Sequence, residues 1–280
     1  MNVMIIGGGG REHALAVKIA ENKSVEKLYA LPGNAGIKQV AECVPIAATD
    51  IEGIVRFAAE NRIGFAVVAP DDPLALGAVD RLHEAGIPCF GPTKAAAMIE
   101  SSKIFSKDLM RKYGIPTAAY QCFDSEAEAT KYLSNCGYPQ VVKADGLALG
   151  KGVVIAQNFE EARAAVHSMM AEGAFGESGK RIVIEEFLEG PEVTVLAFTD
   201  GHTLRPMISS MDHKRAYDGD QGPNTGGMGV IAPSPFYTES VAKIALTTIF
   251  LPTVAAMNQE GRPFKGCLYF GLMLTKDGPK

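Results

Sequence analysis

The chain has 280 residues, of which 47% are hydrophobic and 21% charged, which is enough for a buried core and more than one domain. A net charge of −5 and the lack of a basic stripe exclude a general nucleic-acid binder. The five cysteines show neither a CxxC pair nor the spacing of a zinc site. The apolar segment 1–6 is too short for a signal peptide or a membrane span. We therefore expect a cytoplasmic protein without nucleic-acid or membrane partners.

Short apolar runs alternate with helical patterns over the first hundred residues. We expect strands at 3–6, 27–30, 42–46, 64–68 and 87–90, and helices near 12–22, 51–61 and 73–84. Such alternation predicts a parallel sheet whose ligands bind beyond the carboxyl ends of its strands. We expect residues 1–100 to form one α/β substrate-binding domain.

Residues 94–113 are predicted to form one long helix or two abutting helices. Strands at 118–123, 140–144, 153–155 and 181–185, with helices at 125–136 and 160–170, then predict a second unit. A strand-rich region with a long polar loop follows. We place domain boundaries around the segments 101–191 and 192–280.

The loop Gly7-Gly8-Gly9-Gly10-Arg11-Glu12-His13 follows the first strand and begins a helix. It lacks the third glycine of a dinucleotide fingerprint, and the second strand does not end in a ribose-binding acid, so a nicotinamide dehydrogenase is disfavoured. Two interpretations stay open. The loop either offers backbone N–H groups to a phosphate or carboxylate, or is a tight structural turn.

The segment 141–153 is a glycine- and lysine-rich hairpin between two predicted strands. Lys143 ends the first strand, where its ammonium can reach a phosphate, and Lys151 adds a second charge. Three glycines, Gly146, Gly150 and Gly152, allow the loop to fold over the phosphates. No Gly-Lys-Ser/Thr opens a helix here, so this is not a Walker A loop. The hairpin predicts ATP binding; the alternative is an exposed loop with solvated lysines.

An apolar strand runs into acidic residues within 181–192. Backbone groups near Glu186 and Leu188 can address an adenine edge, and a later carboxylate can accept ribose hydroxyls. By itself this pattern favours solvated glutamates. The lysine hairpin about forty residues earlier makes the nucleotide interpretation stronger.

The polar loop 212–229 is too long for a simple connection. Lys214 and Arg215 can stabilise charge on a transferring phosphoryl group. His213 is either a general base or a solvated side chain. Asp218 and Asp220 lack the rest of an EF-hand pattern.

Several stretches together carry a resemblance to a known family. They are Gly9-Gly10-Arg11-Glu12-His13, Pro32-Gly33-Asn34, Phe90-Gly91-Pro92-Thr93-Lys94-Ala95-Ala96, Lys143-Ala144-Asp145-Gly146-Leu147-Ala148, Asp212-His213-Lys214-Arg215 and Pro223-Asn224-Thr225-Gly226-Gly227-Met228-Gly229. The sequence resembles the glycinamide ribonucleotide synthetase (phosphoribosylamine–glycine ligase) family of the ATP-grasp superfamily. The resemblance implies an α/β fold, with an N-terminal parallel-sheet (pre-ATP-grasp) domain followed by an ATP-grasp domain that is incomplete at its C-terminus.

The resemblance also implies roles for individual residues. Those implied to bind ATP are Lys103, Lys143, Gly146, Gly150, Lys151, Gly152, Glu185, Glu186 and Leu188, with Glu192 on the ribose. Those implied to bind glycine and phosphoribosylamine are Gly10, Arg11, Glu12, His13, Gly33, Asn34, Asp71, Pro223, Asn224, Thr225, Gly226, Gly227 and Met228. Asp212, Lys214 and Arg215 are the implied catalytic residues. Asp71 is one methylene shorter than the family's usual glutamate, which weakens the case for a hydrogen bond there.

The implied reaction has two steps. Glycine's carboxylate takes the γ-phosphoryl group of ATP, and the amine of phosphoribosylamine then displaces phosphate, with Mg²⁺ or Mn²⁺ as cofactor and a monomer as the favoured state. The alternatives are another ATP-grasp carboxylate–amine ligase, or a nucleotide-binding module without catalysis.

The C-terminal end departs from the family pattern. We expect the apolar strand 268–275 to be followed by a turn with no return strand. The metal ligands are then expected beyond Lys280, and the 280-residue chain alone is expected to be inactive.

Overall fold

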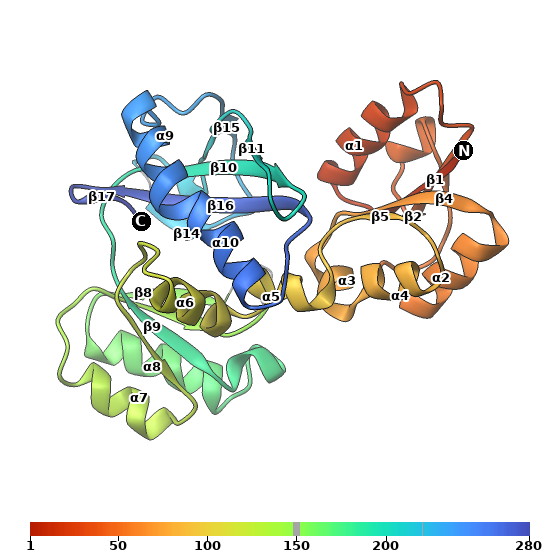
Figure 1. The fold of residues 1–280 in the computed structure, drawn as a ribbon. Coiled ribbons are helices and arrows are strands. Elements are labelled where there is room, and N and C mark those ends of the chain that lie inside the picture. Colours follow the sequence, from red (N-terminus) through yellow and green to blue (C-terminus); the bar gives the residue numbers. More distant parts are fainter. Residues whose placement is uncertain (148–151, 220) are drawn as a thin grey trace. The chain divides into compact units, whose positions relative to one another are not determined.

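The computed structural model describes residues 1–147, 152–219 and 221–280 (Figure 1). The chain divides into two compact units. Unit 1 comprises Met1–Met98 and Arg262–Gly266, and unit 2 comprises Ile99–Gly261 and Cys267–Lys280.

Unit 1 contains the expected parallel sheet, with strand order β3-β2-β1-β4-β5. Its strands are β1 (Asn2–Gly7), β2 (Lys27–Pro32), β3 (Glu42–Cys43), β4 (Ile63–Val68) and β5 (Cys89–Phe90). Its helical elements are α1 (Gly10–Ala20), the 3-10 turn η1 (Ile37–Gln39), α2 (Ile51–Glu60), α3 (Asp71–Leu76), α4 (Ala78–Glu84) and α5 (Lys94–Ser101), whose last residues belong to unit 2.

Helices cover both faces of this sheet, because successive side chains of a strand point to opposite sides. Met4 and Ile6 pack in one core with residues of α2 and α4, whereas Val3 and Ile5 pack in a second core with α1. Both faces of β1 are therefore buried, which explains its continuous apolar run.

Two of the predicted helical segments are each divided. The expected helix 73–84 breaks at Gly77, whose φ of +92° is left-handed, so α3 and α4 are separate helices. In the segment 94–113, α5 is followed by α6 (Lys103–Lys112), which agrees with the alternative of two abutting helices. Ser102 between them is extended and caps α6, because its hydroxyl accepts a hydrogen bond from the Phe105 N–H at 3.1 Å.

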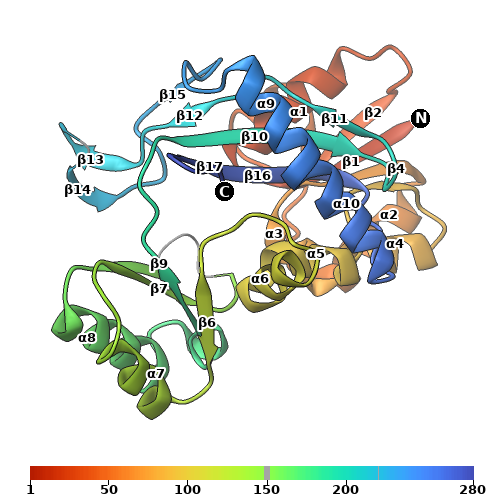
Figure 2. The same ribbon diagram turned by 60° about the vertical axis from the view of Figure 1, so that its left-hand side comes forward.

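The first sheet of unit 2 is antiparallel, with strand order β6-β9-β7-β8 (Figure 2). Its strands are β6 (Tyr120–Phe123), β7 (Gln140–Ala144), β8 (Val153–Ala156) and β9 (Ile182–Glu186). Helices α7 (Glu126–Leu133) and α8 (Phe159–Met170) pack on one face, and the 3-10 turn η2 (Gly176–Gly179) precedes β9.

The second sheet of unit 2 has the order β11-β10-β16-β17. Its strands are β10 (Glu192–Thr199), β11 (Leu204–Pro206), β16 (Gly266–Thr275) and β17 (Gly278–Pro279). One face is covered by α9 (Glu239–Ala245), the π-helical turn η3 (Leu246–Phe250) and α10 (Leu251–Gln259), as both ribbon views show.

The helical stretch 239–259 is long and apolar enough, by length and composition, to cross a membrane. Its most apolar window has a mean hydropathy of 1.6 and is 39% buried. The ring of Phe250 stacks on Phe270 of β16, with 4.1 Å between ring centroids. Covering a sheet therefore accounts for part of its apolar character.

The polar loop 212–229 folds into short antiparallel ladders. β12 (Met211–Asp212) pairs with β15 (Val230–Ile231), and within them β13 (Arg215–Tyr217) pairs with β14 (Gln221–Asn224). The loop is thus a pair of nested hairpins, which brings its two ends together.

The expectation of no return strand after 268–275 is wrong. Gly278 and Pro279 pair with Thr275 and Leu274, and Met273 and Lys280 exchange both backbone hydrogen bonds, at 2.9 and 3.0 Å. The Asp-Gly pair at 277–278 is a strong hairpin signal, and Gly278 has the positive φ that such turns use.

Leu82→Ala is expected to lower the free energy of unfolding by about 2–5 kcal/mol, because Leu82 is fully buried and its loss leaves a cavity. Leu76 on the neighbouring helix is 50% exposed, so Leu76→Ala is expected to cost less than about 1 kcal/mol. Urea denaturation of both variants tests this. Equal losses would contradict the packing of α4 on the sheet.

Candidate functional site

Strand alternation places Lys143 and Glu185 on the same face of the first sheet of unit 2. Val142 on β7 and Ile184 on β9 pack against α7 and α8, so the next residue on each strand points to the opposite face. The register pairs Val142 with Ile184 directly. Lys143 and Glu185 are therefore diagonal neighbours on adjacent strands.

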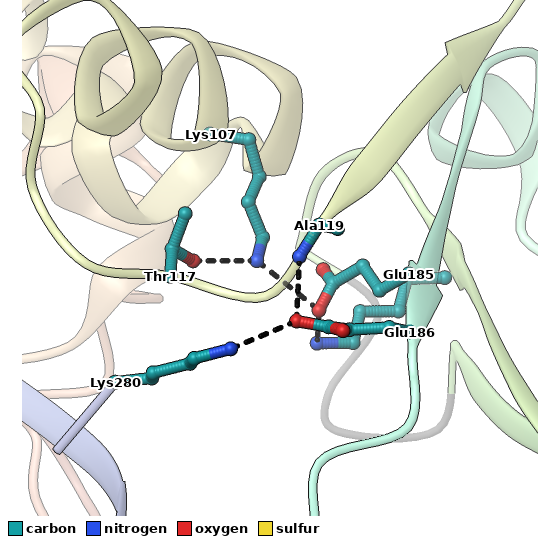
Figure 3. A network of polar contacts seen from close by, with 7 residues as sticks. Lys107, Thr117, Ala119, Glu185, Glu186 and Lys280 are labelled. Atoms are coloured by element: carbon teal, nitrogen blue, oxygen red, sulfur yellow. Dashed lines mark hydrogen bonds and ion pairs between the residues drawn. The ribbon is translucent and has the colours of Figure 1, made fainter. Parts of the chain in front are cut away.

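The Glu185 carboxylate is the centre of a buried cluster of charges (Figure 3). Its Oε2 lies 2.9 Å from Lys143 Nζ and 3.2 Å from Lys107 Nζ. The Glu185 side chain is only 5% exposed, that of Lys107 10% and that of Lys143 27%. Lys107 Nζ also donates a hydrogen bond to Thr117 Oγ1 at 2.7 Å. Two ammonium groups thus share one carboxylate oxygen.

The second oxygen of Glu185 differs from the first. Oε1 is buried and has no hydrogen-bond partner within the described residues. A buried acceptor of this kind has a free-energy cost of about 1–3 kcal/mol unless a donor reaches it. Its capacity to accept a hydrogen bond is thus unused within these residues.

Burial lowers the pKa of Lys107, and the charge of Glu185 opposes this shift. Burial also lowers the pKa of Lys103, where Glu100 is the first opposing charge and Lys143 adds to the lowering. The site therefore concentrates ammonium groups in a poorly hydrated region, where they interact strongly with an anion.

Lys103 connects helix α6 to the glycine-rich hairpin. Its Nζ donates a hydrogen bond to the Gly146 carbonyl at 2.8 Å. Gly146 has a left-handed φ of +114°, and a Cβ there would lie 2.6 Å from Ser178 Oγ. The Ala144 N–H donates to the Gly152 carbonyl at 2.9 Å and closes the hairpin. Gly150 and Lys151, predicted to bind ATP, lie outside the described residues, as does Leu149.

Asp145 holds the start of α6 against the end of β7. Its Oδ1 accepts hydrogen bonds from Ser102 Oγ at 3.0 Å and from the Ile104 N–H at 3.1 Å. Its Oδ2 lies 2.7 Å from Arg181 Nη2. The Asp145 side chain is 5% exposed. These contacts fix Lys103, which lies between Ser102 and Ile104.

Sequence reasoning gave no role to Lys107, and none to Asp145 beyond its place in the hairpin motif. For Lys107 a signal was present, since it follows Lys103 by four residues and so shares a face of α6. Asp145 follows the lysine strand directly, but its partners at 102–104 and 181 come from other elements. No local pattern predicts them.

The segment predicted to face adenine lies at the end of β9. The Glu186 N–H donates to the Ala119 carbonyl at 2.9 Å, and its Oε1 accepts from the Ala119 N–H at 3.0 Å and lies 3.1 Å from Lys280 Nζ. The hydrogen bond from Ala119 is the main reason that the pKa of Glu186 is lowered. Leu188 is half-buried just after the strand. Adenine recognition by this segment stays a prediction.

A predicted ribose ligand and a predicted catalytic lysine form an ion pair. Glu192 Oε2 lies 2.7 Å from Lys214 Nζ, and both side chains are partly exposed. Burial is the largest single influence on the pKa of Lys214 and lowers it. The hydrogen bond that Lys214 donates to Glu192, together with the negative charges nearby, outweighs burial, so the pKa of Lys214 is raised. The guanidinium of Arg215 instead donates to the Gly222 carbonyl at 2.7 Å, inside its own hairpin.

A cavity of about 330 Å³ lies beside the nested hairpins. Its lining includes Asp212, Gly226, Gly227, Thr194 and Tyr269. Asp212 Oδ1 is buried without a hydrogen-bond partner in the described parts of the chain. A Cβ on Gly227 would approach that oxygen to 2.9 Å, and Gly227 has a left-handed φ of +111°, so a larger residue there would crowd the carboxylate.

The other residues predicted in this loop hold its shape or lie at its surface. Thr225 Oγ1 donates to the Lys214 carbonyl at 2.9 Å and accepts from the Gly227 N–H at 3.1 Å. Pro223 and Met228 are exposed. Asn224 pairs through its backbone with Arg215.

In unit 1, the predicted substrate residues meet at the carboxyl ends of β1, β2 and β4. Asn34 Nδ2 donates to the Gly8 carbonyl at 2.9 Å, and the Gly33 N–H donates to Gly7 at 3.2 Å. The exposed Gly10 begins α1, and the exposed Asp71 begins α3. A Cβ on Gly36 would collide with the His13 imidazole.

The Glu12 carboxylate caps its own helix. Its Oε2 accepts from the Gly9 N–H at 2.6 Å, and its Oε1 lies 2.9 Å from Arg11 Nε. Glu12 is 3% exposed, whereas the side chain of Arg11 is 59% exposed. The Gly9 N–H is therefore already bonded inside the protein, which agrees with the interpretation of this loop as a structural turn. The guanidinium of Arg11 is accessible.

The usual protein ligands of metal ions are His, Cys, Asp and Glu side chains. Within 1–147, 152–219 and 221–280, no three His, Cys, Asp or Glu residues gather as a possible metal site. Ligands beyond Lys280 stay a prediction.

Comparison with known proteins gives family matches over the whole chain. Residues 1–100 match the phosphoribosylglycinamide synthetase N domain, and residues 101–280 match the ATP-grasp (A) domain of the same synthetase. The phosphoribosylamine–glycine ligase of Halalkalibacterium halodurans is 51% identical over 280 residues, which are all of this chain and 65% of that protein. That of Streptococcus pneumoniae serotype 4 is 50% identical over 281 residues, covering 67% of its length. The chain thus spans about two thirds of these relatives.

Solved structures agree with this assignment. The crystal structure of the Thermotoga maritima phosphoribosylamine–glycine ligase superposes with a TM-score of 0.82 at 32% identity, covering 100% of this chain and 67% of that one. A biotin carboxylase domain from Hydrogenobacter thermophilus, in complex with magnesium ADP and bicarbonate, superposes with a TM-score of 0.77 at 16% identity. It covers 99% of this chain and 62% of that one, and at this identity it shows the fold alone.

Asp145→Asn is expected to lower the free energy of unfolding by about 1–3 kcal/mol, because it removes the charge that pairs with Arg181 and weakens the bonds to α6. The exposed Asp124 is a matched control, and Asp124→Asn is expected to change stability by less than about 0.5 kcal/mol. Thermal unfolding compares the two. Indistinguishable melting curves would show that Asp145 does not hold α6.

Proposed function

The chain belongs to the phosphoribosylglycinamide synthetase family of the ATP-grasp superfamily, and we propose that it serves as an ATP-dependent ligase. The proposed reaction joins glycine to phosphoribosylamine and gives glycinamide ribonucleotide, ADP and phosphate. The observation that carries this proposal is the set of Lys103, Lys143 and Glu185 beside the Gly146 loop. It supplies cations for ATP phosphates in a chain that the family matches from end to end.

In the first proposed step, a carboxylate oxygen of glycine attacks the γ-phosphorus of ATP. The bond from that phosphorus to the β–γ bridging oxygen breaks, so ADP leaves and glycyl phosphate forms. Lys103 and Lys143 hold the phosphates and offset the charge on the transferring group. In the second step, the amine of phosphoribosylamine attacks the glycyl carbon and phosphate leaves. Positioning carries both steps, without a protein nucleophile.

The cavity beside Asp212 is the proposed binding place for glycine. The Oδ1 of Asp212 is suited to accept a hydrogen bond from the ammonium group of glycine, because a buried carboxylate oxygen without a donor is unfavourable. The volume of about 330 Å³ suits a small substrate. Lys214, two residues along the chain, adds a cation for the carboxylate or the transferring phosphoryl group.

The carboxyl ends of the unit 1 strands are the proposed binding place for phosphoribosylamine. Arg11 offers an exposed guanidinium for its phosphate, and Asn34 holds the neighbouring backbone. Ligands of parallel sheets bind beyond the carboxyl ends of the strands. The exposed Asp71 is placed to accept a hydrogen bond from a sugar hydroxyl.

The remaining parts of the proposal are Mg²⁺ or Mn²⁺ as the metal, a cytoplasmic location and a monomer. The five cysteines, all free thiols, support the location.

The reaction is tested by glycine-dependent release of ADP. The 280-residue chain and the full-length H. halodurans relative are each incubated with Mg-ATP and fresh phosphoribosylamine, with and without glycine. We expect glycine-dependent release by the relative, and we expect the 280-residue chain to bind ATP. Failure of this chain to bind ATP would contradict the proposed nucleotide site. Glycine-independent release by the relative would contradict the proposed substrate.

Lys143→Ala is expected to weaken ATP binding about 10- to 150-fold, because a charge-assisted contact contributes about 1.5–3 kcal/mol. Lys131, exposed on α7, is the control, and Lys131→Ala is expected to leave the dissociation constant unchanged. Titration calorimetry measures both. Equal affinities for the Lys143→Ala variant and the unmodified chain would remove Lys143 from the site.

A further inference from the structure

The buried cluster at Glu185 contains one more positive charge than it needs. Lys107 and Lys143 both contact the same Oε2, so two ammonium groups face one carboxylate. Either lysine alone could neutralise Glu185. Both lysine charges are costly in this buried region unless an anion pairs with them.

The surroundings of the two lysines differ. Lys107 lies within helix α6, is 8% exposed as a residue, and is held by Thr117 Oγ1 as well as by Glu185. Lys143 lies near the end of β7, where the glycine-rich hairpin begins, and its side chain is 27% exposed. Lys107 is therefore fixed, whereas Lys143 is able to turn away from Glu185.

Lys143 has two tasks that conflict. In the structure it neutralises Glu185, but the proposed function requires its ammonium on an ATP phosphate. If Glu185 lost its only cation when Lys143 moved, a buried carboxylate would be left unpaired, and this is strongly unfavourable. A second cation on the same oxygen removes the conflict.

We propose that Lys107 is a positioning residue that keeps Glu185 neutralised, so that Lys143 can leave the carboxylate and bind an ATP phosphate. This inference rests on the proposed function, because it assumes that ATP occupies the site. Lys107 itself contacts no phosphate in this proposal. It acts through Glu185 and Lys143. Because Lys107 keeps Glu185 neutralised, the ammonium group of Lys143 is available to the nucleotide.

The other charged groups facing the cluster do not replace Lys107. Lys103 is a cation, but its ammonium is bound to the Gly146 carbonyl. Glu186 and Asp145 add negative charge, and each has its own cation, Lys280 and Arg181. Within the described residues, Lys107 and Lys143 are the two ammonium groups found in ion-pair contact with Glu185.

The test measures how much the phosphates of ATP contribute to binding. The dissociation constants of ATP and adenosine are measured by displacement of a fluorescent ADP analogue. Their ratio, adenosine over ATP, is compared in four proteins: the unmodified chain, Lys107→Met, Glu185→Gln, and the double variant. A purely structural role for Lys107 would weaken both ligands together and leave the ratio unchanged.

We expect Lys107→Met to lower the ratio about tenfold or more, because Lys143 then stays on Glu185. Adding Glu185→Gln is expected to restore the ratio, since no carboxylate remains to hold Lys143. Glu185→Gln alone is expected to keep the ratio at or above that of the unmodified chain. An unchanged ratio in Lys107→Met, or no recovery in the double variant, would overturn the proposal.

If the unmodified chain binds ATP no better than adenosine, the proposed function fails, and the inference that rests on it fails too. If Lys107→Met does not fold, Thr117→Val decides. This change removes the hydroxyl that holds Lys107, and we expect the ratio to fall about threefold. An unchanged ratio would then overturn the proposal.

Discussion

The lysine cluster of unit 2 depends on one buried carboxylate, that of Glu185. A buried charge needs a partner, and the chain supplies two ammonium groups to the same oxygen. Alternation along β7 and β9 puts Lys143 and Glu185 on the face opposite α7 and α8, and α6 adds Lys107 to the cluster. The two cations are thus held beside a buried carboxylate that either of them can neutralise.

Asp145 has a related task for the neighbouring lysine. It joins the end of β7 to the start of α6, so the position of Lys103 is tied to the strand that carries Lys143. Two buried acidic side chains, Glu185 and Asp145, therefore set the positions of Lys143 and Lys103 beside the glycine-rich hairpin. Phosphoryl transfer depends on positioned charge, so the proposed function requires these carboxylates as supports for the lysines.

The sequence predicts what is local and misses what is brought together by folding. The strands around Lys143 and Glu185 follow from apolar alternation, and the parallel sheet of unit 1 follows from alternating strands and helices. The i,i+4 spacing of Lys107 from Lys103 predicts that the two lysines share a face of a helix. It does not predict that Lys107 pairs with Glu185 on β9. The return strand at Gly278–Pro279 was missed although its Asp-Gly turn was visible, because two residues are too short for an apolar pattern. The free oxygen of Asp212 depends on the nested hairpins, which no periodicity indicates.

The most direct test of this account is a crystal structure of the chain with a non-hydrolysable ATP analogue. We predict that Lys143 Nζ leaves Glu185 and lies within hydrogen-bond distance of a phosphate oxygen, while Lys107 Nζ stays on the Glu185 carboxylate. Phosphates bound away from Lys103 and Lys143 would contradict the proposed nucleotide site. Phosphates bound at Lys103, with Lys143 still paired to Glu185, would contradict the proposal that Lys143 leaves Glu185 to bind the nucleotide.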